Sequence, residues 1–154
     1  MKGVGLMITY KLEEQTQETA IKLEDIRLRS YGIIPTPNDY DKYYIDNIIN
    51  GSILVFTCYQ DDKLISGCYV SNAFNSLYID YLFVLPEYQQ KGLHIGKQLL
   101  EYILANKKQI EEYFNQEFTE SKLYATNDKT KKIYSKMGYT EDPTTELLCK
   151  KLGN

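Results

Sequence analysis

The chain has 154 residues, of which 43% are hydrophobic and 25% are charged, and its formal net charge is −3. These values are typical of one globular domain of ordinary size, so we predict a single domain over residues 1–154. They provide no basic surplus for nucleic-acid binding, and no run approaches the ~20 apolar residues of a membrane span.

The cysteines and the single histidine argue against a metal site. The sequence has an odd number of cysteines, Cys58, Cys68 and Cys149, and no C-x-x-C motif. Neither zinc nor another metal is therefore expected. Residues 1–12 lack the apolar run of a signal peptide. We therefore expect a cytoplasmic protein with reduced thiols and with no membrane or nucleic-acid partner.

The first half of the chain begins with a strand and two helices. Alternation over residues 7–12 predicts the strand. Near-helical spacing of apolar residues over 15–31 predicts a helix, with Thr16 as its cap. After a stretch broken by glycine and prolines, residues 38–49 predict a second helix.

Three runs in the middle of the chain have the composition of strands. Residues 53–59, 64–71 and 77–84 are rich in branched and aromatic side chains. The short polar segments between them, 60–63 and 72–76, indicate turns. These runs predict an antiparallel meander.

The second half predicts two helices and two short strands. The first helix begins at Gly92, reaches about residue 107 and can continue to residue 113. Because a strand–helix–strand unit is right-handed, the strand after it should lie parallel to the strand at 77–84. The remaining elements are a polar loop or frayed helix over 111–120, a strand over 121–126, a helix over 127–137 and a strand over 146–152.

These elements together predict a mixed α/β fold. The central sheet should be mostly antiparallel, with about six or seven strands and helices on both faces.

The junction after the strand at 77–84 predicts an anion site. Its sequence over residues 84–100 is VLPEYQQKGLHIGKQLL. The first N–H groups of a helix lack internal partners, the helix dipole adds positive charge there, and glycines let the backbone approach a ligand. Lys91 and Lys97 add positive charge nearby.

Two familiar phosphate motifs do not fit this junction. The spacing from Gly92 to Gly96 is one residue short for a P-loop, and G-x-G-x-x-G is absent. The pattern [QR]-x-x-[GA]-x-[GA] fits with two departures, Lys91 at the first position and His94 at the first small one. A strand-to-helix turn that contains two glycines and binds nothing is the alternative interpretation.

A second pattern lies near the end of the chain. Residues 127–139 resemble N-x-x-A-x-x-x-[YF]-x-[KR]-x-G-[FY], with Thr130 in place of the alanine. The positions in register are Asn127, Tyr134, Lys136, Gly138 and Tyr139.

The two patterns in this order, separated by a helix and a strand, resemble the GNAT superfamily of acyl-CoA-dependent N-acetyltransferases over about residues 5–152. The resemblance implies that acetyl-CoA is the cosubstrate, without a metal. It also implies direct attack, in a ternary complex, by a primary amine of a small molecule or a peptide. A regulatory module that binds acyl-CoA without turnover is the alternative, and a homodimer stays open.

The resemblance also implies where acetyl-CoA binds. In this family the fourth and fifth strands part after a bulge, and the pantetheine arm lies between them. The implied cofactor-binding residues are Leu82, Phe83 and Val84 on the strand, Lys91, Gly92, Leu93, His94, Ile95, Gly96 and Lys97 in the turn, and Asn127, Lys132 and Tyr134 in the second pattern. His94 is either a passenger or an additional donor to phosphate.

Two residues are candidates for catalysis. Tyr134 is expected to be the acid that protonates the leaving thiolate, unless it is only a packed tyrosine. Asp80 is expected to be the base or the anchor of the amine, unless it is only an exposed strand residue. The acceptor side is expected to be lined by Tyr31, Tyr40, Tyr43, Tyr44, Tyr78 and Tyr81.

Overall fold

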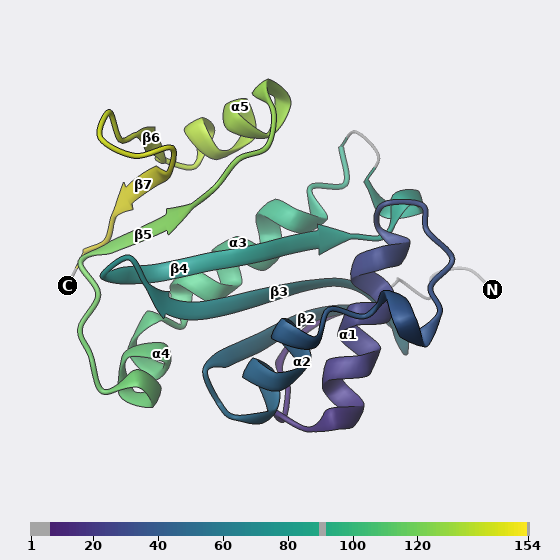
Figure 1. Cartoon of the computed structure of the whole chain (residues 1–154). Coiled ribbons are helices and arrows are strands. Elements are labelled where there is room, and N and C mark those ends of the chain that lie inside the picture. Colours follow the sequence, from purple (N-terminus) through teal and green to yellow (C-terminus); the bar gives the residue numbers. More distant parts are fainter. Residues whose placement is uncertain (1–6, 90–91, 154) are drawn as a thin grey trace.

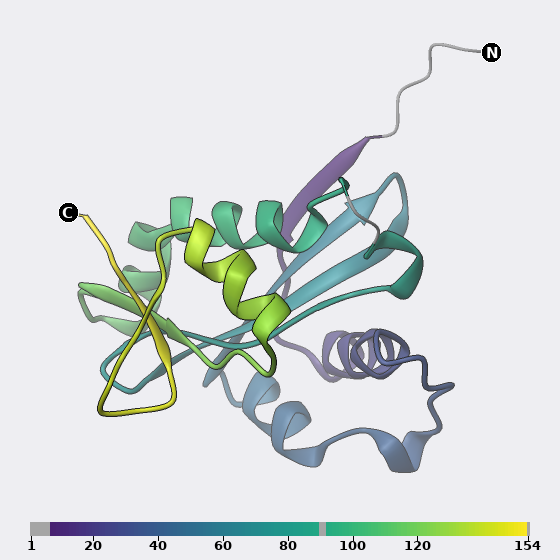
Figure 2. The same cartoon turned by 90° about the horizontal axis from the view of Figure 1, so that it is seen from above.

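A computed structural model describes residues 7–89 and 92–153 of the chain. Within these ranges, seven strands form one sheet in the order β1-β2-β3-β4-β5-β7-β6. Helices α3 and α5 lie on one face of the sheet, and α1 and α2 lie on the other (Figures 1 and 2). The predicted mixed sheet with helices on both faces is therefore confirmed.

Strands β1 to β4 are mutually antiparallel and confirm the predicted meander. The last turn of the meander consists of Phe74 and Asn75 alone, both with φ of 53°. Two consecutive residues with positive φ are typical of a tight type I′ hairpin, so β3 and β4 extend further than predicted. The bounds are β1 Ile8–Leu12, β2 Ile53–Gln60, β3 Lys63–Ala73 and β4 Ser76–Val84.

The first helix agrees with its prediction, and the second is shorter. In α1 (Gln17–Arg29) the backbone N–H of Thr19 donates to Thr16 Oγ1 at 3.1 Å, as expected of the cap. Helix α2 (Lys42–Ile49) begins only after Asp41, whose carboxylate caps it. The residues before it form a separate 3₁₀ turn, η1 (Pro37–Asp39). Pro37 starts this turn, and the Asp39 side chain forms a capping box with Thr36, the residue before the turn.

The second half contains the expected helices and strands with changed bounds. They are η2 Pro86–Tyr88, α3 Ile95–Ala105, α4 Lys107–Phe114, β5 Glu120–Leu123, α5 Asp128–Lys136, β6 Thr140–Glu141 and β7 Leu148–Lys151. Helical structure continues to Phe114, within the range that the prediction allowed, but as a separate helix: α3 ends at Ala105, and α4 begins at Lys107 and buries Ile110 against the core. Strand β6, which has two residues, was not predicted.

Two hydrophobic layers hold the helices on the sheet. Leu99 and Ile103 of α3 belong to the layer on one face, and Leu23 of α1 and Ile48 of α2 belong to the layer on the other. All four side chains are fully buried, and each such burial stabilises the fold by roughly 1.5–3 kcal/mol. No helix within the described residues is long and apolar enough to cross a membrane.

Candidate active site

The sheet is interrupted at Asp80, in the middle of β4. Tyr69 of β3 pairs with Tyr81, but the next residue, Val70, pairs with Ile79, so Asp80 is an extra residue without a partner on β3. Such a β-bulge bends its strand and redirects its side chain. Asp80, a predicted site residue, is therefore at a position where the chain departs from regular pairing.

Strands β4 and β5 part at the same point. They are parallel, as predicted, but pair only over Leu77–Ile79 and Ser121–Leu123. Beyond Asp80, β4 has no strand on its β5 side within the described residues, and β5 diverges from it toward α5 (Figure 1). The predicted binding residues Leu82, Phe83 and Val84 lie on this part of β4. We call it the unpaired part of β4 because β3 pairs with one of its edges and no strand among the described residues pairs with the other.

Helix α3 begins beside the unpaired end of β4. A Cβ atom on Gly96 would lie 3.4 Å from Val84 Cγ2 and 3.7 Å from Leu82 Cδ2, so the glycine permits close packing of the first turn. The first backbone bond of the helix joins Gln98 N to His94 O at 3.0 Å. The N–H groups of the residues between them have no such helical partner, as at any helix N-terminus.

The turn before α3 has a left-handed backbone at two residues. Gly92 has a φ of 95° and His94 a φ of 54°, so the helix begins at Ile95 and not at Gly92 as predicted. The His94 side chain is exposed and makes no capping hydrogen bond. Leu93 and Lys97 are also exposed, whereas Lys91 lies outside the described residues.

Asn127 caps α5, as its place in the second motif predicts. The N–H of Thr130 donates to Asn127 Oδ1 at 2.9 Å, and the N–H of Asn127 donates to Thr130 Oγ1 at 3.4 Å. Thr130, the departure from the family pattern, thus completes a capping box. Lys132 is exposed on the same helix.

Tyr134 and Asp80 both lie near the buried thiol of Cys68. Burial raises the pKa of Cys68, and the negative charge of the Asp80 carboxylate raises it further. Burial, with a smaller contribution from this thiol, raises the pKa of Tyr134 to about 12. Tyr134 also packs against the hydrophobic cluster that contains Cys68. Two residues 54 positions apart in the sequence, one on α5 and one in the bulge, are therefore both within electrostatic range of this thiol.

The protonation states at this point suit acid–base chemistry. With a pKa of about 12, the Tyr134 hydroxyl keeps its proton at neutral pH. Among the described residues it has no hydrogen-bond partner, whereas Tyr139 Oη is 2.8 Å from Ser121 Oγ. Burial raises the pKa of the Asp80 carboxyl, which makes this carboxylate a stronger base.

A cluster of aromatic rings lies on the face of the sheet covered by α1 and α2 and includes Tyr81, the residue after Asp80. The Tyr44 ring lies 4.8 Å from Tyr69 and 5.9 Å from Tyr81 between centroids, and the hydroxyl of Tyr31 donates to that of Tyr81. The Asp80 charge contributes, after burial, to the raised pKa of Tyr44. The structure thus brings these predicted acceptor-side tyrosines together.

Two other predicted tyrosines lie differently. Tyr43 is exposed and contacts Tyr44 edge-on at 5.4 Å, while Tyr78 is half-buried on β4, two residues from Asp80. Tyr40 donates its hydroxyl to Asp25 Oδ2 at 3.3 Å, a contact that ties η1 to α1.

Sequence reasoning missed the ion pair that supports this aromatic cluster. Arg27 Nε and Nη2 donate to Glu24 at 2.7 and 2.8 Å, and Glu24 also accepts from the Tyr69 hydroxyl at 2.7 Å. The Arg27 guanidinium lies over the rings of Tyr44 and Tyr81, at 5.3 and 5.1 Å from their centroids. Burial lowers the pKa of Arg27, but the bonds and charge of Glu24 outweigh this effect and raise it. The i,i+3 spacing on α1 was the available signal.

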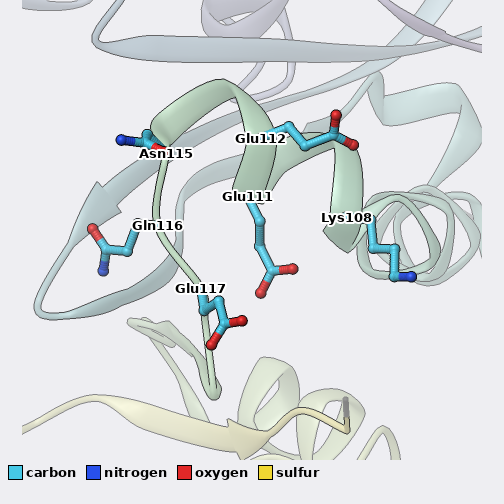
Figure 3. A pocket seen from close by; sticks show the side chains of 6 residues that line it. All are labelled: Lys108, Glu111, Glu112, Asn115, Gln116 and Glu117. Atoms are coloured by element: carbon cyan, nitrogen blue, oxygen red, sulfur yellow. The ribbon is translucent and has the colours of Figure 1, made fainter.

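One open hollow of the surface lies away from these residues. It has a volume of about 410 Å³ and lies against α4 and the segment after it (Figure 3). Its Glu111 already accepts from the backbone N–H of Phe118 at 2.7 Å, so this carboxylate has a structural role. The lining residues are Lys108, Glu111, Glu112, Asn115, Gln116 and Glu117. No group of three metal-ligating side chains occurs within the described residues.

The fold and the site agree with one family of proteins. The sequence model of the acetyltransferase (GNAT) domain matches residues 51–141, which include the bulge, the turn before α3 and the cap of α5. The chain belongs to the GNAT acetyltransferase family.

Comparison with solved structures identifies the same fold. PaiA N-acetyltransferase from Thermoplasma acidophilum, solved in complex with coenzyme A, has a TM-score of 0.63 at 20% identity, over 93% of this chain and 99% of that one. The ribosomal-protein-S18-alanine N-acetyltransferase from Escherichia coli has a TM-score of 0.65 at 17% identity, over 96% of each chain. An acetyltransferase from Thermus thermophilus has a TM-score of 0.69 at 16% identity, over 94% of this chain and 97% of that one. No curated protein matches significantly.

Proposed function

We propose that this protein is an acetyl-CoA-dependent N-acetyltransferase that acetylates a primary amine of a small molecule or a peptide. The observation that carries the proposal is the bulge at Asp80, the point where β4 and β5 part. The pKa of the nearby Cys68 thiol responds to Asp80, and that of Tyr134 responds to this thiol. The same place lies beside the N-terminus of α3, which suits an anionic pyrophosphate.

The reaction needs one proton removed and one supplied. An alkylammonium has an ordinary pKa near 10.4, so it must lose a proton before its nitrogen can attack the thioester carbonyl. Asp80, with its raised pKa, takes this proton directly or through a water molecule. A C–N bond forms, the carbonyl oxygen carries the negative charge, and backbone N–H groups on the unpaired part of β4 stabilise it.

Collapse of this intermediate breaks the C–S bond. The thiolate of coenzyme A leaves and takes a proton from the Tyr134 hydroxyl, which is protonated at neutral pH. The products are an N-acetyl amide and free coenzyme A. The second proton of the amine nitrogen is lost to solvent, and Tyr134 is reprotonated from solvent.

Calorimetric titration with acetyl-CoA tests the first half of the proposal. We expect saturable binding of acetyl-CoA and no binding of ATP or NAD, because the site combines the α3 turn with the unpaired part of β4. Absence of acetyl-CoA binding by folded protein would contradict the proposed cosubstrate.

Release of free thiol in the presence of a panel of amines tests the second half. The alternative function is a regulatory module that binds acyl-CoA without turnover. Tight acetyl-CoA binding with no thiol release for any amine would favour this module over the enzyme.

A further inference from the structure

We call three aromatic side chains near Asp80, those of Tyr43, Tyr78 and Phe74, the aromatic row. The Phe74 ring, in the β3–β4 turn, lies 4.9 Å from the Tyr78 ring on β4. Tyr43 of α2 contacts Tyr44 edge-on, with 5.4 Å between the ring centroids, and its phenol contributes, after burial and Asp80, to the raised pKa of Tyr78. Tyr43 and Phe74 are each 59% exposed, so much of each ring is open to solvent.

The inner end of this row presents oxygen atoms that suit an ammonium group. Tyr78 and Asp80 are two residues apart on β4, and the Tyr44 ring of α2 lies 5.9 Å from that of Tyr81, the residue after Asp80. The Asp80 charge contributes to the raised pKa of both Tyr44 and Tyr78. A primary ammonium has three N–H donors, and a carboxylate with two phenol oxygens offers three acceptors.

Neighbouring rings differ in how much of their surface is free. The Arg27 guanidinium already lies over the rings of Tyr44 and Tyr81, and Tyr44 also packs against Tyr69. These rings are part of the folded core. Surface for a ligand is therefore left mainly on Tyr43, Tyr78 and Phe74.

The outer end of the row already holds a cation. Lys122 of β5 pairs with Tyr78 in the sheet register, and its ammonium donates to the Phe74 carbonyl at 3.0 Å. The same ammonium forms an ion pair with Glu120, at 3.8 Å, so its charge is partly compensated. A second positive charge on the ligand would thus meet a like charge at this end, whereas an uncharged flat group would not.

The geometry points to an acceptor that is a primary amine with an aromatic or similar flat apolar group, which packs on Tyr43, Tyr78 and Phe74. This inference rests on the proposed function and narrows its substrate class. Aromatic contacts of this kind prefer offset or edge-to-face geometry, which the open row permits.

Three probe amines separate this class from its neighbours. 2-Phenylethylamine has the ring, n-butylamine lacks it, and 1,4-diaminobutane has a second ammonium in place of the terminal methyl group. With acetyl-CoA in excess, we expect kcat/KM to be about tenfold higher for 2-phenylethylamine than for n-butylamine. The diamine should be acetylated no better than n-butylamine.

Variants locate the effect on the row. Tyr43→Ala and Phe74→Ala should each raise KM for 2-phenylethylamine about threefold or more, with little change in kcat and no change for n-butylamine. Ile49→Ala is the matched control, since it removes a 47% exposed apolar side chain from the same helix. It should leave both amines unaffected.

The outcomes distinguish the inference from the function on which it rests. Equal acetylation of 2-phenylethylamine and n-butylamine, or a preference for the diamine, overturns the inference and leaves the acetyltransferase standing. An equal loss for both monoamines in the Tyr43 and Phe74 variants also overturns it. If acetyl-CoA binds and none of the three amines is acetylated, the proposed function fails for this class and the inference fails with it.

Discussion

Tyr134, which is half-buried, and Tyr139, which is buried, are two phenols of one motif with different surroundings. Their rings are 6.0 Å apart, and only the Tyr139 hydroxyl is paired, with Ser121. Removing the Tyr134 hydroxyl should therefore affect chemistry, and removing that of Tyr139 should affect stability.

Tyr134→Phe is expected to lower kcat for acetyl transfer about 100-fold or more, because the leaving thiolate loses its proton donor. The Kd of acetyl-CoA and the melting temperature should change little. Tyr139→Phe is the control, with a loss of about 1 kcal/mol in the free energy of unfolding and a nearly normal kcat. Undiminished kcat in Tyr134→Phe would exclude this residue as the acid.

Asp80 couples activity to stability. Burial raises its folded-state pKa above the unfolded value, so in the window between the two values the folded state binds more protons than the unfolded chain. Stability is then greatest below the unfolded pKa, near 3.9, and falls as the pH rises through the folded pKa.

Asp80→Asn should therefore raise the melting temperature at pH 7 and lower kcat about 100-fold through loss of the base. The gain in melting temperature should disappear near pH 3, where the wild-type carboxyl is also neutral. Melting curves and initial rates at several pH values measure both effects. Asp62→Asn, in the exposed β2–β3 turn, should change neither; a lower melting temperature for Asp80→Asn at pH 7 would contradict the argument.

At the scale of elements, the start of α3 includes a residue that the local backbone disfavours. His94 has a left-handed φ of 54° without a capping bond from its side chain, at a cost of roughly 1–2 kcal/mol. His94→Gly should relieve this cost, partly offset by the greater freedom of glycine in the unfolded chain. The net gain in the free energy of unfolding should reach at most about 1 kcal/mol.

The same variant decides how His94 relates to the cosubstrate. We expect the Kd of acetyl-CoA in calorimetry to stay within about twofold, because backbone N–H groups bind the pyrophosphate and the exposed side chain is a passenger. A tenfold weaker Kd, which corresponds to about 1.4 kcal/mol, would instead identify His94 as a donor to phosphate.

Features of the elements that depend on nearby residues were predictable from the sequence. The caps Thr16 and Asn127 bond to residues three positions later, so the pattern of side chains was sufficient. The start of α3 was placed three residues early, since a glycine and a histidine with positive φ are not distinguished from helix by apolar spacing.

Features that depend on strand pairing were not predictable in this way. The bulge exists because Asp80 lacks a partner between Tyr69 and Val70, and this register is a property of two strands. The sequence therefore indicated Asp80 by its place on the strand, but not that the strand bends there. The burial of Glu24 similarly depends on the approach of α2, whose Asp41 N–H donates to it at 2.8 Å.

At the scale of the whole molecule, the Glu24–Arg27 pair joins three elements on the acceptor face. Glu24 is fully buried and receives bonds from α1, from the Tyr69 hydroxyl on β3 and from the backbone before α2. Every buried side-chain polar atom within the described residues has a partner. Loss of one member would therefore leave a charge in the interior without its counterpart.

Arg27→Met is expected to lower the free energy of unfolding by about 3–5 kcal/mol, because Glu24 stays buried without its cation. The exposed pair Lys42–Asp46 of α2 is the matched control: it has the same charge types at 2.6 Å, but its side chains are 86% and 51% exposed. Lys42→Met should cost less than about 0.5 kcal/mol, since solvent screens this pair. Urea unfolding of both variants compares the two costs directly. Equal costs would mean that the buried pair does not stabilise the packing of α1 and α2 on the sheet. The expected difference would show that the packing of Tyr44 and Tyr81 over Arg27 depends on this pair.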